Sequence, residues 1–361
     1  MQFMKTAKRR SRALIVTMVM ASIAPGMAAA EEREHPKKPI EERNLWRLEW
    51  DNDAFVRVDN GFTNGWSLQR HSHQQDAWHE MEPSKFSAWI SRTIPGLNDE
   101  GGRVVKRGTG LSQIMMTPED LENPNPQPGD VPWAGSLGWA ESWYAFDNQT
   151  LNAFQIYFGI LGPYSLAESL QVQLHDLINA DEPLGWDNQL PTEPLLNLNY
   201  TFKRKLVSAG EYATKGFTGD FAIGLEGALG NLATSAGLTL EGRFGWGLPK
   251  GFVQLPDPPG FGIMLDPEKG VPGKFHVYFS VVYRVVATGH SVFFDGNMLR
   301  DSPHPGLEYD AISRATIFGF HADHGRYAIH FNFYKYNDRP FESVNPLTGL
   351  TWGNITFEYR F

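Results

Sequence analysis

The chain ends in WGNITFEYRF, residues Trp352 to Phe361, where apolar and polar side chains alternate strictly up to a terminal aromatic residue. Alternation with a period of two predicts a β-strand that has one apolar face and one polar face. A plain edge strand is the simplest alternative, but an exposed apolar edge invites aggregation, and closing a sheet into a barrel removes the edge. We therefore expect residues 352–361 to be the closing strand of a β-barrel.

Further segments upstream show similar alternation, and Phe154-Gln-Ile156-Tyr-Phe158 is a clear example. With the last segment, the candidate strands number twelve: 45–51, 63–70, 109–115, 136–146, 151–161, 195–203, 218–226, 236–246, 275–287, 307–320, 326–336 and 352–361. An even number is typical of single-chain bacterial barrels with both termini in the periplasm. The sequence predicts an all-β fold, a twelve-stranded antiparallel transmembrane β-barrel over residues 45–361, with a short helix in an extracellular loop.

The N-terminal region has the features of an export signal. Basic residues precede an apolar run, Ala13 to Ala24, and a small-residue cleavage pattern ends at Ala30. This predicts a signal peptide over residues 1–30, followed by a polar lead-in over 31–44. The net charge of −9 argues against a nucleic-acid partner. We expect a monomer in the outer membrane of a Gram-negative cell, in contact with its lipids.

The order of the strands places the connections. With a periplasmic N-terminus, the connections 52–62, 116–135 and 162–194 are extracellular, whereas 71–108 and 247–274 are periplasmic and unusually long for that side. Residues 84–93 have the pattern of a short helix. A stronger helix follows Ser165, which with Glu168 forms a capping box. Its apolar stripe has helical spacing, ends near Asn179, and predicts a helix packed on the barrel wall with a groove between them: Leu166, Leu170, Leu174, Leu177 and Ile178.

Two extracellular connections contain residues that suit catalysis or metal binding. The first hairpin carries Asp51, Asn52 and Asp53, which are either ordinary turn residues or oxygen ligands for calcium. The helix carries His175, followed by Asp181 and Glu182. An imidazole near a carboxylate is a usable general base at neutral pH, although a lone surface histidine is the simpler interpretation.

Motifs of several other chemistries are missing. The sequence has no Gly-x-Ser-x-Gly elbow, His-Glu-x-x-His pair or phosphate-binding loop. The triplet His71-Ser72-His73 leaves a phospholipase-type serine hydrolase as a minor alternative.

These motifs resemble those of the outer-membrane lipid A 3-O-deacylase family over nearly all of residues 45–361. The resemblance lies in four sets: Asn52-Asp53 with Thr63-Asn64-Gly65; Gln113 to Asp120 with Pro132 to Gly135; His175 with Asp181 to Leu190 and Glu193-Pro194; and Gly230-Asn231 with Thr234 and Gly237. It implies a twelve-stranded barrel that hydrolyses the 3′ ester-linked acyloxyacyl chain of lipid A, or of lipopolysaccharide, and requires Ca²⁺.

The same resemblance implies roles for individual residues. His175 would be the base that activates water, with Asn52, Asp53 and Thr63 at the catalytic site. Asp53 and Asp181 would be calcium ligands; at position 181 a form of the family has glutamate. A Lys-Arg pair of the family is missing from the acidic segment Glu119 to Asp130. Two alternatives therefore stay open: an esterase acting on another acylated lipid, such as a phospholipid, and a barrel without enzymatic activity.

Overall fold

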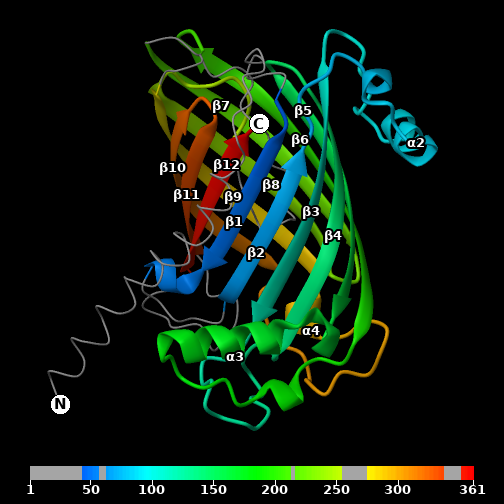
Figure 1. The fold of residues 1–361 in the computed structure, drawn as a ribbon, viewed down its shortest axis with the longest axis vertical. Helices are drawn as coiled ribbons and strands as arrows, with labels where there is room; N and C mark the ends of the chain where they lie inside the picture. Colours follow the sequence, from blue (N-terminus) through cyan, green and yellow to red (C-terminus); the bar gives the residue numbers. More distant parts are fainter. Residues whose placement is uncertain (1–42, 57–61, 213–215, 254–274, 337–350) are drawn as a thin grey trace, which may run out of the picture.

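The computed structural model describes residues 43–56, 62–212, 216–253, 275–336 and 351–361. Its strands are β1 (Leu45–Asn52), β2 (Phe62–His71), β3 (Val104–Met116), β4 (Ala134–Phe146), β5 (Thr150–Leu161), β6 (Glu193–Ala209), β7 (Phe217–Gly230), β8 (Ala233–Trp246), β9 (Phe275–Ser291), β10 (Ile312–His324), β11 (Tyr327–Tyr336) and β12 (Thr351–Arg360). Each strand pairs antiparallel with its neighbours in the chain, and β1 pairs with β12, so the sheet closes (Figure 1). The predicted twelve-stranded barrel is confirmed. The predicted signal peptide and residues 31–42 of the lead-in lie outside the described residues.

The alternation in β12 places polar side chains in the lumen and apolar side chains on the outer wall. Thr356 and Glu358 are buried inside, whereas Ile355 and Phe357 are partly exposed outside. After the last strand, the Phe361 amide donates to the Asn44 carbonyl at 3.0 Å, across the seam where the barrel closes. Apolar side chains outside and polar ones inside are the arrangement that a bilayer requires of a barrel.

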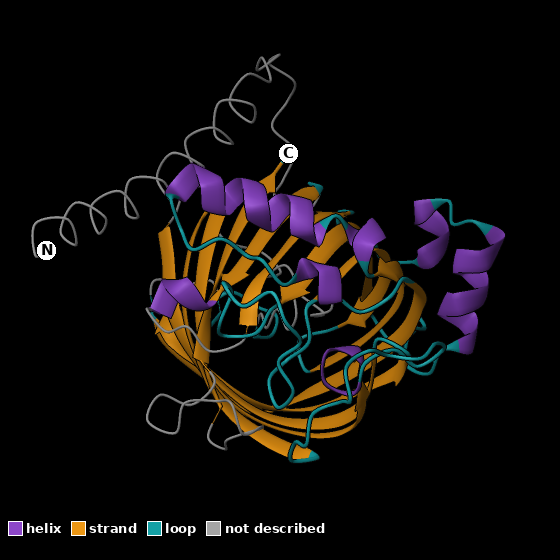
Figure 2. Ribbon diagram, turned by 90° about the horizontal axis from the view of Figure 1, so that it is seen from below, coloured by secondary structure: helices purple, strands orange, loops and turns teal. Residues whose placement is uncertain are grey.

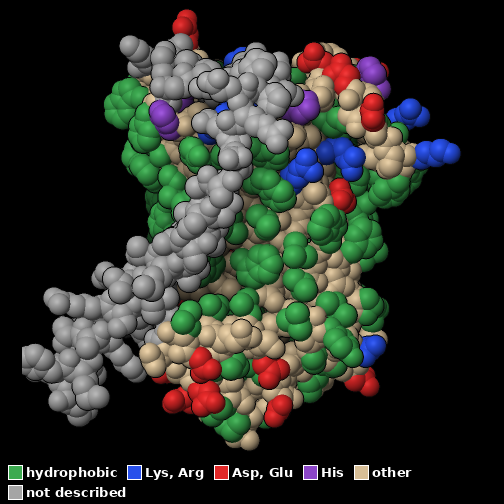
Figure 3. All heavy atoms as spheres, viewed as in Figure 1, with side chains coloured by type: hydrophobic (Ala, Val, Ile, Leu, Met, Phe, Trp, Pro, Cys, Tyr) green, Lys and Arg blue, Asp and Glu red, His purple; other side chains and the backbone are tan. Residues whose placement is uncertain are grey.

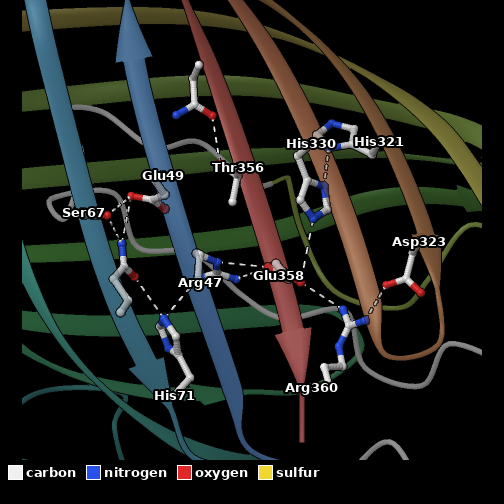
Figure 4. A network of polar contacts seen from close by, with 12 residues as sticks. Arg47, Glu49, Ser67, His71, His321, Asp323, His330, Thr356, Glu358 and Arg360 are labelled. Carbon is white, nitrogen blue, oxygen red and sulfur yellow. Dashed lines mark hydrogen bonds and ion pairs between the residues drawn. The ribbon is translucent and has the colours of Figure 1, made fainter. Parts of the chain in front are cut away.

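The lumen between β1, β2 and β10–β12 is filled by buried charged side chains (Figure 4). Glu358 accepts hydrogen bonds from Arg47 Nε and Arg360 Nη2, both at 2.9 Å. Arg360 also pairs with Asp323 at 2.8 Å, and Arg47 lies 3.2 Å from His71. Because these side chains are 4% exposed or less, they leave little room for a wide water-filled channel in this part of the barrel.

The long connection after β8 folds into the barrel at its described start. Leu248, Phe252 and Val253 are buried. Lys203 Nζ donates to the Val253 carbonyl at 3.2 Å, and Arg243 Nη2 donates to the Gly251 carbonyl at 2.7 Å. The described start of the connection therefore contributes to the core of the lumen; residues 254–274 lie outside the described part of the chain.

Helices lie at both ends of the barrel (Figures 1 and 2). α2 (Lys85–Thr93), capped by Ser84, belongs to the connection between β2 and β3, and α3 (Ala167–Ile178) belongs to the connection between β5 and β6. Both were predicted. The remaining short helices are η2 (Asp53–Val56), η3 (Trp78–Met81), η4 (Pro163–Ser165), η5 (Trp186–Asn188) and α4 (Val292–Asp295). None of the helices within the described residues has the length and hydropathy needed to cross a membrane.

Candidate active site

One end of the barrel gathers η2, the loop from β3 to β4, α3 and α4, while α2 and both termini of the sheet lie at the other end (Figure 1). The connections 52–62, 116–135 and 162–194 therefore share one end, as far as their residues are described, and 71–108 lies at the opposite end. This agrees with the predicted grouping of these connections at the two ends. With both termini of the sheet in the periplasm, as expected for such barrels, the end with α3 corresponds to the predicted extracellular end.

The end of the β1–β2 hairpin carries polar residues on the outside of the wall. Asn52 and Trp50 point to the same side of β1 as the exposed Trp46, and Asn64 to the same side of β2 as the exposed Leu68. Asn64 Oδ1 accepts from Trp50 Nε1 at 2.6 Å and from Asn52 Nδ2 at 3.5 Å. Polar side chains facing a membrane are costly and typically functional.

The other predicted residues of this hairpin lie close by in the chain. Asp53, which is 8% exposed, begins η2, and η2 packs on β12. Thr63 lies in β2, between Phe62 and Asn64, where the register with β3 shifts. Asn52, Asp53 and Thr63 thus belong to the same corner of this end by their positions in β1, η2 and β2.

α3 packs against the outside of the same wall. Gln113 and Met115 point to the same side of β3 as the exposed Leu111, yet both are buried. Gln113 Nε2 donates to the Ser165 carbonyl at 2.7 Å, and Gln113 Oε1 accepts from Trp66 Nε1 at 3.0 Å. A line of outward-facing polar contacts therefore runs from β2 to the start of α3.

Details of the predicted helix need correction. Ser165 lies in η4, where its Oγ accepts from the Ala167 amide at 3.4 Å. The N-cap residue of α3 is Leu166, which has a φ of 61° and a side chain without a hydrogen-bond acceptor. Leu166 and Leu177 of the predicted apolar stripe are 59% and 61% exposed. The turn at η4 rotates the start of the helix, so that Ala167 and Gln171 are buried in their place.

His175 is partly buried near the C-terminal end of α3, the end directed toward the side of η2 in both Figure 1 and Figure 2. Its Nδ1 lies 2.6 Å from the backbone carbonyl oxygen of Asp181. A carbonyl only accepts, so Nδ1 carries the proton and Nε2 of the neutral ring is an acceptor. Asp181 thus orients His175 through its backbone, and its carboxylate is exposed to solvent.

Gln171 is a further candidate that the sequence interpretation left without a role. It precedes His175 by one helical turn and is 2% exposed. Its Oε1 accepts from Trp186 Nε1 at 2.7 Å, which orients the amide, and its Nε2 is buried without a hydrogen-bond partner among the described residues. In the sequence, the one sign of a role for Gln171 was its position four residues before His175, which places both side chains on the same side of a helix. The side chain offers an oriented donor beside a possible base.

Glu193 and Asn231, both in the predicted motifs, hold the extracellular loops together. Glu193 accepts from Asn231 Nδ2 at 2.8 Å, from Asn297 Nδ2 at 3.1 Å and from the Leu299 amide at 3.0 Å. Glu193 is fully buried. These two residues support the fold of the rim and lie away from the solvent.

The extracellular loops are acidic, as the red side chains at the lower end of Figure 3 show. Glu119, Asp120 and Glu122 are exposed in the loop from β3 to β4. Burial lowers the pKa of His304, which lies against Asp130, so this ring is neutral at neutral pH. Exposed basic side chains at this end include Arg300 in the loop from α4 to β10, and Arg314 on β10 and Lys335 on β11, the last two on the outer wall.

The described residues bring together no group of three or more His, Asp or Glu side chains able to hold a metal ion. A calcium site at the corner of Asn52 and Asp53 would therefore use the Asp53 carboxylate together with amide or backbone oxygens, which are ligands that calcium accepts. Ser72 of the alternative serine site lies at the periplasmic end, just after β2, where its Oγ accepts from the Arg107 amide at 3.0 Å.

Gly135 of β4 allows α3 to approach the wall. A Cβ at this position would overlap Ala167 Cβ and Ser165 Oγ. Gly135→Ala is expected to displace α3 and to lower any activity of the site by about 10²-fold, because misplaced catalytic groups lose their geometry. Gly227→Ala is the matched control, since its Cβ would meet nothing within 4 Å. Equal turnover by the two folded variants would show that α3 need not touch the wall.

The comparisons with known proteins agree with the resemblance seen in the sequence. A family model described as outer membrane protein LpxR matches residues 14–361. LpxR from Salmonella typhimurium has a similar structure, with a TM-score of 0.68 and 13% identity over 88% of this chain and 100% of that chain. The β domain of the Bordetella autotransporter BrkA matches with a TM-score of 0.43 and 7% identity, over 88% of this chain and 99% of that chain. No curated protein matches the sequence. The chain belongs to the LpxR family of outer membrane proteins, and its place is the outer membrane of a Gram-negative cell.

Proposed function

We propose that this barrel is a lipid A 3-O-deacylase, which hydrolyses the ester of the 3′ acyloxyacyl chain with water activated by His175. Membership of the LpxR family supports a lipid A deacylase of the outer membrane. The observation that carries the proposal is the line of polar side chains on the outer wall, from Asn52 and Asn64 through Gln113 to α3. A site on the lipid-facing side can act on a substrate that stays in its leaflet.

The residues present suit ester hydrolysis by water. His175 Nε2 would accept a proton from water as the water oxygen attacks the ester carbonyl carbon. Gln171 Nε2, whose amide is held by Trp186, would donate to the oxyanion once the substrate displaces the side chains that bury it. The proton on His175 would then pass to the leaving oxygen. The products are the acyloxyacyl acid, with its secondary ester intact, and a lipid A with a free 3′ hydroxyl group, and no serine nucleophile takes part.

We further propose that Ca²⁺ binds at Asp53, with Asp181 as a second candidate ligand. The donors near Asp53 are oxygens, and the chain has no cysteine, so the site suits a hard cation. When bound, the ion would supply positive charge near the ester carbonyl. Thr63 would help to position groups at this corner.

The two enzymatic candidates, a lipid A deacylase and an esterase acting on another acylated lipid, differ in whether the site must bind the phosphate groups of lipid A. The loop from β3 to β4 is acidic, which favours an esterase acting on a less anionic acylated lipid as a second candidate. For a lipid A substrate, the outward-facing Arg314 and Lys335 are the side chains we propose to meet its phosphate groups. The buried charges that fill the lumen argue against the third candidate, a pore.

Chelation of calcium is expected to abolish turnover. Refolded barrel in detergent would be incubated with lipid A, dephosphorylated lipid A or phospholipid, each with Ca²⁺ or with chelator, and the products identified by mass spectrometry. We expect loss of the 3′ acyloxyacyl group only with Ca²⁺, and a higher Ca²⁺ requirement in Asp53→Asn and Asp181→Asn.

Each other outcome of this assay has a meaning. Hydrolysis of phospholipid alone would favour the second candidate, and turnover in chelator would remove calcium from the mechanism. No turnover by a folded barrel on any of the lipids would favour a protein without enzymatic activity.

A further inference from the structure

Exposed aromatic side chains line the periplasmic end of the barrel on both sides of a gap that runs from β2 to β6. They are Trp46, Phe217, Trp246, Phe275, Tyr327 and Phe361, which belong to β1, β7, β8, β9, β11 and the end of β12. On β3, β4 and β5 the large exposed apolar side chains are Leu111, Trp139 and Phe158, in the middle or outer half of each strand. Aromatic belts mark the boundary between hydrocarbon and headgroups, so the described wall has a gap in its belt here.

The connection between β2 and β3 covers this gap from the outside. Trp143 points to the same side of β4 as the exposed Trp139, yet it is 1% exposed. It is buried with Trp78 and Ile90 of the connection, and its Nε1 donates to Ser87 Oγ at 2.7 Å. Tyr200 OH on β6 donates to the Pro95 carbonyl at 3.0 Å. The connection thus lies against the membrane-facing wall instead of extending into the periplasm.

α2 also leaves apolar side chains half exposed at the edge of its contact with the wall, where the Phe86 ring lies 6.3 Å from that of Trp143. Phe86 and Trp89 are 51% and 56% exposed, and their rings stack at 6.0 Å. Lys85 and Arg92 are exposed on the same side of the helix, since positions 85, 89 and 92 share a face. α2 contains no acidic residue. In the region of α2 in Figure 3, basic side chains project outward, with hydrophobic side chains below them and acidic ones above.

We propose that α2 lies in the headgroup region of the inner leaflet and replaces the missing part of the aromatic belt. Its partner is a phospholipid surface: Phe86 and Trp89 enter the acyl-chain boundary, and Lys85 and Arg92 meet anionic headgroups. Aromatic rings with flanking basic residues are typical of interfacial helices. Two observations specify lipid as the partner: the helix continues the lipid-facing wall, and its charge complements anionic phospholipid. This interaction is independent of the proposed deacylase site at the other end.

Because the chain contains no cysteine, a single introduced cysteine can be labelled to measure how deeply α2 lies in the membrane. Trp89→Cys would carry an environment-sensitive fluorophore in barrels reconstituted into phosphatidylethanolamine and phosphatidylglycerol vesicles. Labels at Leu111→Cys on the outer wall and at Glu80→Cys, exposed in η3 of the same connection, are the membrane and water references. We expect position 89 to match position 111: quenched by brominated phospholipid, and several-fold less accessible to iodide than position 80.

Two outcomes would overturn the proposal. Iodide quenching equal to that at position 80, without quenching by brominated lipid, would place α2 in water. Protection from both quenchers would mean that protein, such as a second copy of the chain, covers the helix.

A charge-reversal variant tests the contact with headgroups. Lys85→Glu with Arg92→Glu, in the labelled Trp89→Cys chain, should reduce quenching by brominated lipid several-fold in vesicles containing phosphatidylglycerol, and less in vesicles of phosphatidylcholine alone. The label at position 111 should not change, which checks that the barrel is intact. Equal quenching before and after reversal would remove Lys85 and Arg92 from the interaction.

Discussion

His175→Ala is expected to lower the rate of lipid A deacylation by about 10²- to 10⁴-fold, the usual contribution of a general base. The hydrogen bond from Nδ1 to the Asp181 carbonyl fixes the tautomer in which Nε2 accepts a proton. The loss should appear in kcat with little change in KM, because the ring would act on water in the transition state. Release of the acyloxyacyl acid, followed by mass spectrometry at saturating Ca²⁺, measures the change in rate.

His79→Ala is the matched control, since this histidine is exposed in η3 at the opposite end of the barrel. Its activity should equal that of the unchanged chain. Full turnover by a folded His175→Ala variant would exclude His175 as the base and would leave the role of α3 to Gln171.

Glu358→Ala is expected to lower the free energy of unfolding by about 3–5 kcal/mol, the usual cost of removing one partner of a buried ion pair. Glu358 accepts from Arg47 and Arg360, and His330 lies 3.8 Å away. In this variant Arg360 still forms its ion pair with Asp323. Arg47, however, loses the carboxylate that both its Nε and its Nη2 contact. Tryptophan fluorescence during urea unfolding of the refolded barrel measures the difference.

Glu141→Ala provides the comparison for this measurement. Glu141 pairs with Arg107 at 3.4 Å on the outer wall, and both side chains are about one-third exposed. A pair of this kind contributes below about 1 kcal/mol. Equal unfolding midpoints for the two variants would mean that the lumen is hydrated well enough to solvate Arg47 without its partner.

Strand positions could be read from the sequence because side-chain alternation is a local property of a strand. Even so, β10 was expected at 307–320 and lies at Ile312–His324. Leu307 is buried in the loop instead, and its amide donates to the Phe294 carbonyl at 2.8 Å. The ends of a strand depend on which residues of the neighbouring strand are available for pairing, and alternation does not contain that information.

The site could be predicted less completely than the fold. The sequence motifs that resemble those of the family pointed to Asn52, Asp53, Thr63 and His175. The order of the strands placed the connections that carry these residues at one end of the barrel. Neither the motifs nor the strand order showed that Asp181 orients His175 through its carbonyl, because a backbone contact leaves no mark on residue type. Gln171 was not assigned a role because its importance depends on Trp186, fifteen residues away.

The sequence by itself determined a closed twelve-stranded barrel, its family and the end at which the polar loops meet, since these follow from alternation, strand order and motifs. The tertiary structure decided where the long connections lie. Residues 247–253 fold into the lumen, α3 packs on the outer wall at one end, and α2 packs on the outer wall at the other. The physical reason is that a loop settles where distant segments offer it apolar surface and hydrogen-bond partners, and those partners meet only after the barrel has closed.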